Sequence, residues 1–515
     1  MIQRNMWGPG VADDGHGQLE GCGCGCGCLS YWTRHLPKQT VSNEEMNTEI
    51  SRILPTEILL SIIDQIELDE DLLVLAATSR LFHHLSLRSY FSRHDFDPTS
   101  NNLLLNSYEG SFKIIFALAI SLDLHDTSID SLVYDLGQEF LNRPDELVQE
   151  VRLLTRYLSK ISTVGSVCIR LANYFPDQPK QWKEASLLLL STVLSKSCRD
   201  IHIVTSSISS YETSQKPSDW TKNYWPKTRP TGGHLKIFSI QTFPQFLRQF
   251  YLHTLRANRY ILRSLSFTRI FGGGDEWATM LANLHFPRLA KLHISFVVFP
   301  RDLLIKFITQ HPTLAEFEYH HIRYIPPPKH PARFKKGAFG CLHSLIVSPE
   351  HLLTFLPPLS QMPFLTEVII KIDEMGPSSF VPLDHSLHRL AVCTNKITLS
   401  LEINRTGVGF GAWFHAIFRN GLNPTERPER LLHCVEMLVM DNADWGFTDN
   451  VLAAQLPVWL KLFPAVRTLT LKCGGPQFRN MLTLEEHGGS SASFLENLRE
   501  ACPELHIEWL QNDGS

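Results

Sequence analysis

Cysteine is the residue type whose spacing in this chain most directly suggests chemistry. The run GCGCGCGC alternates glycine with Cys22, Cys24, Cys26 and Cys28. Closely spaced thiolates can chelate Cu(I) or Zn²⁺, and glycine would let the backbone wrap around the ion. The same alternation also arises by simple-sequence expansion. Because residues 1–50 are rich in glycine and polar residues and show no apolar period, we predict a disordered low-complexity tail rather than a metal site.

Catalytic signatures are weak in the rest of the chain. Neither HExxH nor GxSxG occurs, and the glycine-rich segment FGGGDEW at 271–277 lacks the Lys-Ser/Thr of a phosphate-binding loop. The adjacent pairs His83-His84 and His320-His321 have no matching cysteine or carboxylate framework. We therefore predict no catalytic residue, no metal site and no cofactor. The chain is expected not to be an enzyme, and an enzyme in its C-terminal region is the least favoured alternative.

Length and charge limit the remaining function classes. The 515 residues are 43% hydrophobic, which supplies enough apolar material for a large core and excludes wholesale disorder. A net charge of −4 indicates neither a nucleic-acid-binding surface nor a membrane-binding one. No apolar run approaches the roughly 18 residues of a membrane-spanning helix, and the N-terminus has no apolar signal region. We expect a reduced, soluble protein of the cytoplasm, the nucleus or both.

Residues 51–94 follow a helical pattern instead. A first apolar stripe recurs at helical spacing, in Ile58, Leu59, Ile62, Ile63 and Ile66. After a short acidic turn, a second apolar set extends from Leu72 to Leu85. Some forty residues cannot bury so much apolar surface alone, so the two helices need a partner surface. That surface is either another protein or the rest of this chain, in which case the helices are an ordinary docked hairpin.

The sequence LPTEILLSIIDQIELDEDLLVLAATSRLFHHL, residues 54–85, resembles an F-box. The family pattern begins LPxE with an apolar run and continues, after an acidic link, with DLL and a later Ser-Arg. Leu81, Phe82 and Leu85 stand where the family often has a cysteine and a tryptophan. The resemblance implies docking on the Skp-type adaptor of a cullin–RING ubiquitin ligase. The contacts that it implies are Leu54, Pro55, Ile58, Leu59, Ile62, Leu72 and Leu75.

Short apolar strands with a similar lead-in recur from about residue 110 to 511. FPRLAKLHI, HPTLAEFEY and MPFLTEVII are three copies, and successive anchor leucines from Leu262 to Leu365 are 27, 25, 28 and 23 residues apart. Such spacing fits one strand and one helical or irregular return per unit. We predict an α/β chain in which the helical F-box precedes an irregular leucine-rich-repeat-like solenoid with a parallel concave sheet. A doubly wound α/β domain is the alternative, although no Gly-rich phosphate loop supports it.

Alternation along these strands predicts which side chains reach the open face of the sheet. If Leu265 and Phe267 point inward, the neighbouring units present Lys291, His293 and Ser295, then Glu316, Glu318 and His320. Mixed charge and histidine suit a protein or peptide ligand better than a polyanion. We select Lys291, His293, Glu316 and Glu318 as candidate substrate-binding residues; the alternative for each is an ordinary solvated strand residue.

Two loops interrupt the repeats. Residues 206–233 are rich in Ser, Pro and Gly and contain Trp220 and Trp225, which either fold back on the solenoid or anchor a substrate. Residues 323–337 combine a proline run with five basic side chains, which either contact an acidic or phosphorylated segment or are simply solvated. Trp220 and Trp225 complete the candidate binding set.

These patterns together predict a substrate-recognition subunit of an SCF-type cullin–RING E3 ubiquitin ligase. The F-box would bind the Skp-type adaptor, and the solenoid would bind an unknown protein substrate; no nucleic acid or membrane is expected as a partner. A repeat scaffold that binds proteins without a ubiquitin ligase is the alternative.

Overall fold

The computed structural model describes much of the chain beyond the tail. The described residues are 54–106, 111–122, 124, 127–136, 144–171, 180–205, 233–241, 247–269, 278–279, 281–297, 299–320, 334–335, 337–355, 362–372, 380–393, 395–403, 427–441, 450–474, 496 and 498–512. Within them, no helix has both the length and the apolar character needed to cross a membrane. The chain divides into two compact units, Met1–Tyr90 and Phe91–Ser515, and the boundary falls inside a helix.

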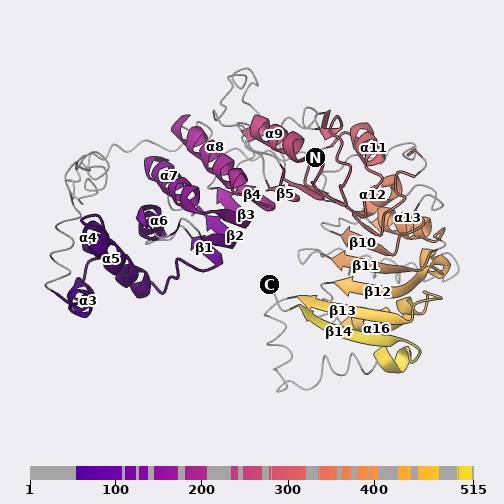
Figure 1. The fold of residues 1–515 in the computed structure, drawn as a ribbon. Helices are drawn as coiled ribbons and strands as arrows, with labels where there is room; N and C mark the ends of the chain where they lie inside the picture. Colours follow the sequence, from indigo (N-terminus) through magenta and orange to yellow (C-terminus); the bar gives the residue numbers. More distant parts are fainter. Residues whose placement is uncertain are drawn as a thin grey trace, which may run out of the picture. The chain divides into compact units, whose positions relative to one another are not determined.

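The first unit is helical. Its described helices are α3 (Thr56–Asp64), α4 (Asp69–Ala76) and the greater part of α5 (Arg80–Arg93) (Figure 1). Acidic residues occupy the first turn of α4, where they complement the positive end of the helix dipole. Leu59 and Ile63, one turn apart on α3, are buried with Leu72 of α4. Ser89 Oγ donates a 2.7 Å hydrogen bond to Asp64 Oδ1, which ties α5 to the end of α3.

The second unit contains one parallel sheet of fourteen described strands, in which each strand pairs with the next along the chain. The strands are β1 (Asn102–Asn106), β2 (Ser128–Asp135), β3 (Thr163–Leu171), β4 (Asp200–Thr205), β5 (Ile237–Gln241), β6 (Ser264–Thr268), β7 (Lys291–Ser295), β8 (Glu316–His320), β9 (Ser344–Val347), β10 (Glu367–Ile372), β11 (Ile397–Ile403), β12 (Val435–Asp441), β13 (Thr468–Gly474) and β14 (His506–Asn512). Parallel neighbours require a crossover after every strand, and the helices supply many of these.

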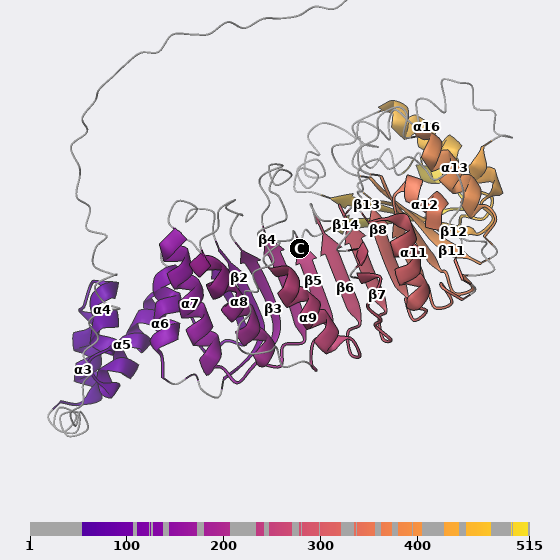
Figure 2. The same cartoon turned by 90° about the horizontal axis from the view of Figure 1, so that it is seen from above.

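The described helices of the second unit lie on one side of the sheet. They are α6 (Ser111–Ile120), α7 (Pro144–Lys160), α8 (Lys180–Ser195), α9 (Arg248–Asn258), α11 (Arg301–Gln310), α12 (Pro349–Phe355), α13 (Phe380–Leu390), the 3-10 helix η8 (Pro428–Leu431) and α16 (Asn450–Leu460). Figures 1 and 2 show α6 to α13 along the outer side of a curved sheet. A 2.9 Å hydrogen bond from the Tyr134 hydroxyl of β2 to buried Glu150 of α7 joins the sheet to this layer. We call the opposite side of the sheet the open face.

The core between sheet and helices follows the alternation of the strands. Leu265 and Phe267 of β6 are buried, as are Leu292 and Ile294 of β7, and the pattern continues along the sheet. The predicted inward positions of β6 are therefore confirmed. Ser295 and His320 also lie on the predicted outward side of their strands, where Ser295 contacts Thr268 and His320 contacts Glu318, but both are buried there. His320 stacks against His293 of the preceding strand and meets the edge of the Phe296 ring, which covers it.

The segment that precedes each of these strands recurs because its backbone makes the same hydrogen bonds in successive units. The Arg263 carbonyl accepts the amides of Ala290 and Lys291 at 2.8 and 2.9 Å, and the Ala290 carbonyl accepts those of Ala315 and Glu316 at the same distances. The anchor leucines Leu262, Leu289, Leu314, Leu342 and Leu365 are all buried just before their strands. The units of β6 to β10 thus repeat one buried leucine and one shared carbonyl, which aligns each of these strands with the one before it.

The sheet begins earlier than expected. β1 starts at Asn102, whereas the sequence places the repeat region at 110–511, and α6 was not anticipated as a helix. The predicted tail at 1–50 and the loop 206–233, apart from Gly233, lie outside the described residues. Of the loop 323–337, Phe334, Lys335 and Gly337 are described.

Candidate functional site

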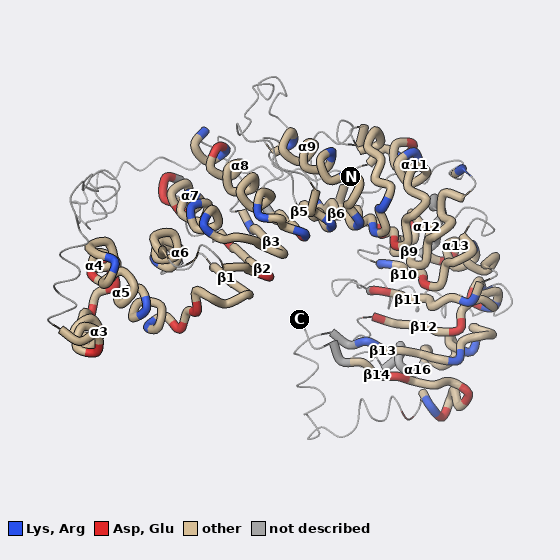
Figure 3. The backbone as a smooth tube through the Cα atoms, viewed as in Figure 1, with Lys and Arg blue, Asp and Glu red and all other residues tan. Residues whose placement is uncertain are grey.

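The register of the sheet arranges the open face in rows. One row crosses five strands through Ser239, Ser266, His293, Glu318 and Ile346. Basic and acidic residues are interspersed along the strands of this unit, as Figure 3 shows. Four of the six predicted binding residues are neighbours here, because Lys291 pairs with Glu316 and His293 with Glu318 in the β7–β8 register.

Lys291 and Glu316 form an ion pair of 2.7 Å between Nζ and Oε2. Both side chains are well exposed to solvent. Exposed pairs of this kind contribute at most about 1 kcal/mol to stability, because water screens the charges and both side chains lose rotamer freedom. The pair adds local charge to the open face without fixing its structure.

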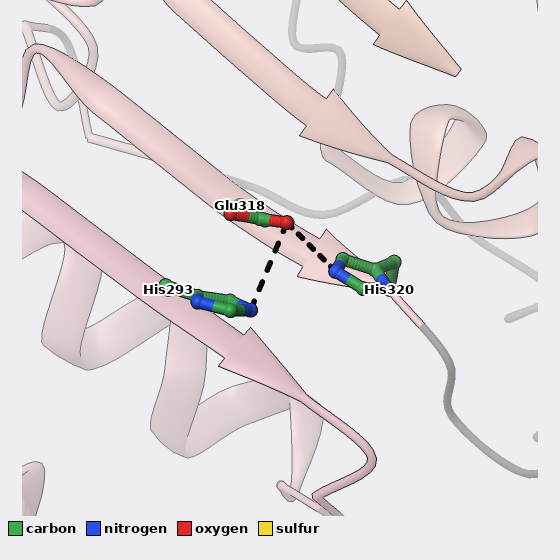
Figure 4. A group of neighbouring side chains, drawn as sticks. All are labelled: His293, Glu318 and His320. Carbon is green, nitrogen blue, oxygen red and sulfur yellow. Dashed lines mark hydrogen bonds and ion pairs between the residues drawn. The ribbon is translucent and has the colours of Figure 1, made fainter. Parts of the chain in front are cut away.

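A tighter group lies in the middle of the face, and we call it the His–Glu–Lys cluster: His293, Glu318, His320 and Lys371. Glu318 Oε1 lies 2.7 Å from His320 Nε2 and 3.7 Å from His293 Nε2 (Figure 4). Lys371 Nζ donates a 2.7 Å hydrogen bond to the same oxygen. One carboxylate oxygen therefore receives two imidazole edges and an ammonium from three strands, β7, β8 and β10.

The cluster is electrostatically strong because it is only partly open to water. Burial alone would raise the pKa of Glu318, but the hydrogen bond from His320, the charge of His293 and the Lys371 ammonium lower it to about 2. For Lys371, burial favours the neutral amine, yet the contacts with Glu318 and Glu402 raise the pKa above its ordinary value. The carboxylate and the ammonium are both ionised at neutral pH, so Glu318 is available as a charged acceptor or ligand.

Two contacts hold the imidazoles in place. Ser266 Oγ on β6 lies 3.1 Å from His293 Nδ1, which leaves Nε2 of the same ring directed toward Glu318. The His293 and His320 rings stack with their centroids 5.6 Å apart and their planes at 18°. Both rings are thereby oriented by neighbouring strands before any ligand arrives.

The predicted adaptor-contact residues fall into three classes of exposure. Ile58 and Ile62 are 47% and 53% exposed, Pro55 is exposed, Leu54 and Leu75 are half-buried, and Leu59 and Leu72 are buried. Ile58 and Ile62 are one turn apart, so they form an apolar strip on the outside of α3. Leu59 and Leu72 instead pack inside the helical unit, where they support that strip.

Sequence reasoning found His293 and Glu318 but not the group that they belong to. The His320-His321 pair was expected to lack a carboxylate, whereas Glu318 precedes His320 by two residues and both side chains lie on the same strand. Lys371 is 53 residues from Glu318 and reaches it only through the sheet. Trp220 and Trp225, the other two candidates, lie outside the described residues. Comparison of the chain with protein-family models and with curated proteins finds no match.

Proposed function

We propose that this chain is a non-enzymatic substrate-recognition subunit of an SCF-type cullin–RING ubiquitin ligase. In this proposal the helical unit is an F-box that docks on a Skp-type adaptor, and the sheet-bearing unit is a leucine-rich-repeat-like domain that binds a protein substrate. Its contribution would be proximity, since it would hold a substrate lysine near a ubiquitin-charged enzyme. Such a complex would act in the cytoplasm, the nucleus or both.

The observation that carries the proposal is the exposed strip of Ile58 and Ile62. Both isoleucines lie within the segment that resembles an F-box, and both expose about half of their surface. Leu68, at the start of α4, is 60% exposed and adds to the apolar surface of the same small unit. Burying an isoleucine or leucine contributes about 1.5–3 kcal/mol, so a few such anchors suffice for a stable interface.

The open face supports the substrate-binding half of the proposal. Its side chains carry both charges, as in the Lys291–Glu316 pair, rather than the single basic field that nucleic acids require. The helices leave this side of the sheet open over many strands. A long polar face with fixed charges suits an extended protein segment, whose charged side chains can pair along it.

The adaptor claim is tested by a pull-down of the full chain with purified Skp-type adaptor. The variant Ile58→Asp/Ile62→Asp changes exposed positions, so the fold should remain intact. We expect its affinity for the adaptor to fall at least about 100-fold, because two apolar anchors are lost. Leu188→Asp is the matched control, since Leu188 is 48% exposed on α8 of the other unit. It should bind like the wild type.

Absence of adaptor binding by the wild type, or equal binding by the double variant, contradicts F-box docking. Normal adaptor binding without co-purification of a cullin from cells favours the repeat scaffold that acts without a ligase. Substrates are best sought by proximity labelling with the F-box deleted, since captured substrates would then not be passed on for ubiquitination.

A further inference from the structure

Three potential metal ligands meet on the open face, within the His–Glu–Lys cluster. His293, Glu318 and His320 each offer one donor atom, and these atoms all lie within 4.8 Å of one another. In a tetrahedral zinc site with bonds of about 2.0–2.1 Å, neighbouring ligand atoms are about 3.4 Å apart. The observed 2.7 and 3.7 Å separations between Glu318 Oε1 and the two imidazole nitrogens bracket that value.

We propose that His293, Glu318 and His320 bind a Zn²⁺ ion. Two imidazole nitrogens and one carboxylate oxygen are a ligand set that zinc takes in proteins, and three protein ligands leave a fourth position for water or a substrate group. Both imidazoles already direct a nitrogen toward the Glu318 carboxylate. Shifts of about 1 Å in the side chains would complete the coordination geometry.

The backbone holds these ligands on rigid elements. Glu318 and His320 are two residues apart on β8, so their side chains point to the same face. His293 lies opposite Glu318 on β7, so hydrogen-bonded strands fix the spacing of all three residues. Ser266 Oγ contacts His293 Nδ1 at 3.1 Å, which is the outer-shell hydrogen bond that typically orients a metal-bound histidine. Ser266 is therefore a positioning residue, which acts on the ion through His293.

Lys371 competes with the ion. Its ammonium lies 2.7 Å from Glu318 Oε1, the oxygen that also faces both histidines. Binding of Zn²⁺ requires this ammonium to move away, and Glu402 Oε2, at 3.6 Å, is an alternative acidic partner. Lysine and zinc are thus exclusive partners of one carboxylate oxygen. An ion-pair cluster without any metal function would instead lose stability when Lys371 is replaced.

The test uses the full chain with Cys22, Cys24, Cys26 and Cys28 replaced by serine, because four thiols that alternate with glycine could bind zinc by themselves. Calorimetric titration with ZnCl₂ measures affinity and stoichiometry, and titration with CoCl₂ reports the ligand type. We expect one bound Co²⁺ with visible d–d bands and without thiolate-to-cobalt charge transfer. His293→Ala should weaken zinc binding at least about 100-fold, and Ser266→Ala about 10-fold.

Two further variants decide between a metal site and an ion-pair cluster. Lys371→Met should tighten zinc binding by about tenfold or more, since it removes a like charge from the ligand oxygen. His506→Ala is the matched control, because His506 pairs with Glu508 at 3.4 Å on the open face of β14. It should leave zinc binding unchanged. Circular dichroism checks that each variant is folded.

Absence of one-to-one binding by the parent protein overturns the proposal. So does binding that survives His293→Ala and Glu318→Gln, or that weakens in Lys371→Met. The proposal does not depend on F-box docking, since the adaptor pull-down and the zinc titration use different units and different variants.

Discussion

Two strands of the same sheet carry a histidine and a glutamate two residues apart on the open face, with different results. On β8, Glu318 and His320 are 2.7 Å apart, and their side chains are 18% and 7% exposed. On β14, His506 and Glu508 are 3.4 Å apart, and their side chains are 71% and 45% exposed. The pairs have the same chemistry, so the difference lies in what surrounds them.

Position in the sheet explains the difference. β8 lies between β7 and β9, whereas β14 is the last of the described strands and pairs there with β13 alone. Flanking strands supply His293 and exclude water, and β10 supplies Lys371. Partial exclusion of water lowers the effective dielectric constant, so each charge interaction is stronger on β8 than on β14. A functional cluster therefore depends on neighbouring strands more than on the local residue pair.

The largest expected effect on stability comes from the apolar residues next to the two pairs in the sequence. Phe317 of β8 is fully buried, whereas Ile507 of β14 is half-buried. Phe317→Ala should lower the free energy of unfolding by about 3–5 kcal/mol, because it leaves a cavity in the core. Ile507→Ala should cost only about 1 kcal/mol, because it removes less buried surface. Urea denaturation of the full chain measures both, and equal losses would show that the interior and terminal strands are equivalent.

The second test removes one charge from each pair. Glu318→Gln should lower the free energy of unfolding by about 2 kcal/mol at neutral pH, after allowance for solvent screening, because the ionised Lys371 loses its closest partner. Glu508→Gln should stay within about 0.5 kcal/mol of the wild type, as exposed substitutions usually do. Glutamine preserves the shape of the side chain in both variants, so a comparable loss at Glu508 would contradict the role assigned to the neighbouring strands.

The third test is the pH dependence of the Glu318 effect. The folded pKa of about 2 is below the ordinary value of 4.5, so the ionised carboxylate stabilises the fold above about pH 4.5. This stabilisation is lost as the pH falls toward 2. The difference in unfolding free energy between wild type and Glu318→Gln should therefore shrink to roughly half by about pH 3. Urea midpoints at several pH values measure it, and a difference that stays constant to pH 2 contradicts the lowered pKa.

The smallest expected effect concerns the exposed pair beside the cluster. Lys291→Ala removes the 2.7 Å contact with Glu316, yet it should change the free energy of unfolding by only about 0.5 kcal/mol or less. The same denaturation assay at low and high salt would check it. If Lys291→Ala lowered the free energy of unfolding as much as Glu318→Gln does, exposure to solvent would not explain the difference between this pair and the contacts of Glu318.

Local periods in the sequence predicted many elements of the fold. The helical spacing within residues 51–94 indicated the helices of the first unit, and the anchor leucines indicated the strands that follow them. β1 and α6 were missed, since no lead-in of the common type precedes them. On α3, the apolar stripe was evident, but its division into buried Leu59 and exposed Ile58 and Ile62 was not. All three have apolar side chains, and only packing against α4 and α5 separates them.

By itself, the sequence determined which residues alternate toward the open face, because side-chain direction along a strand has a period of two. It therefore identified His293 and Glu318 as polar residues whose side chains point to the same face of the sheet. Only the tertiary structure decided that Lys371 and His320 share one oxygen of Glu318. That contact depends on the register between strands joined by returns of unequal length, and no local period records such a register.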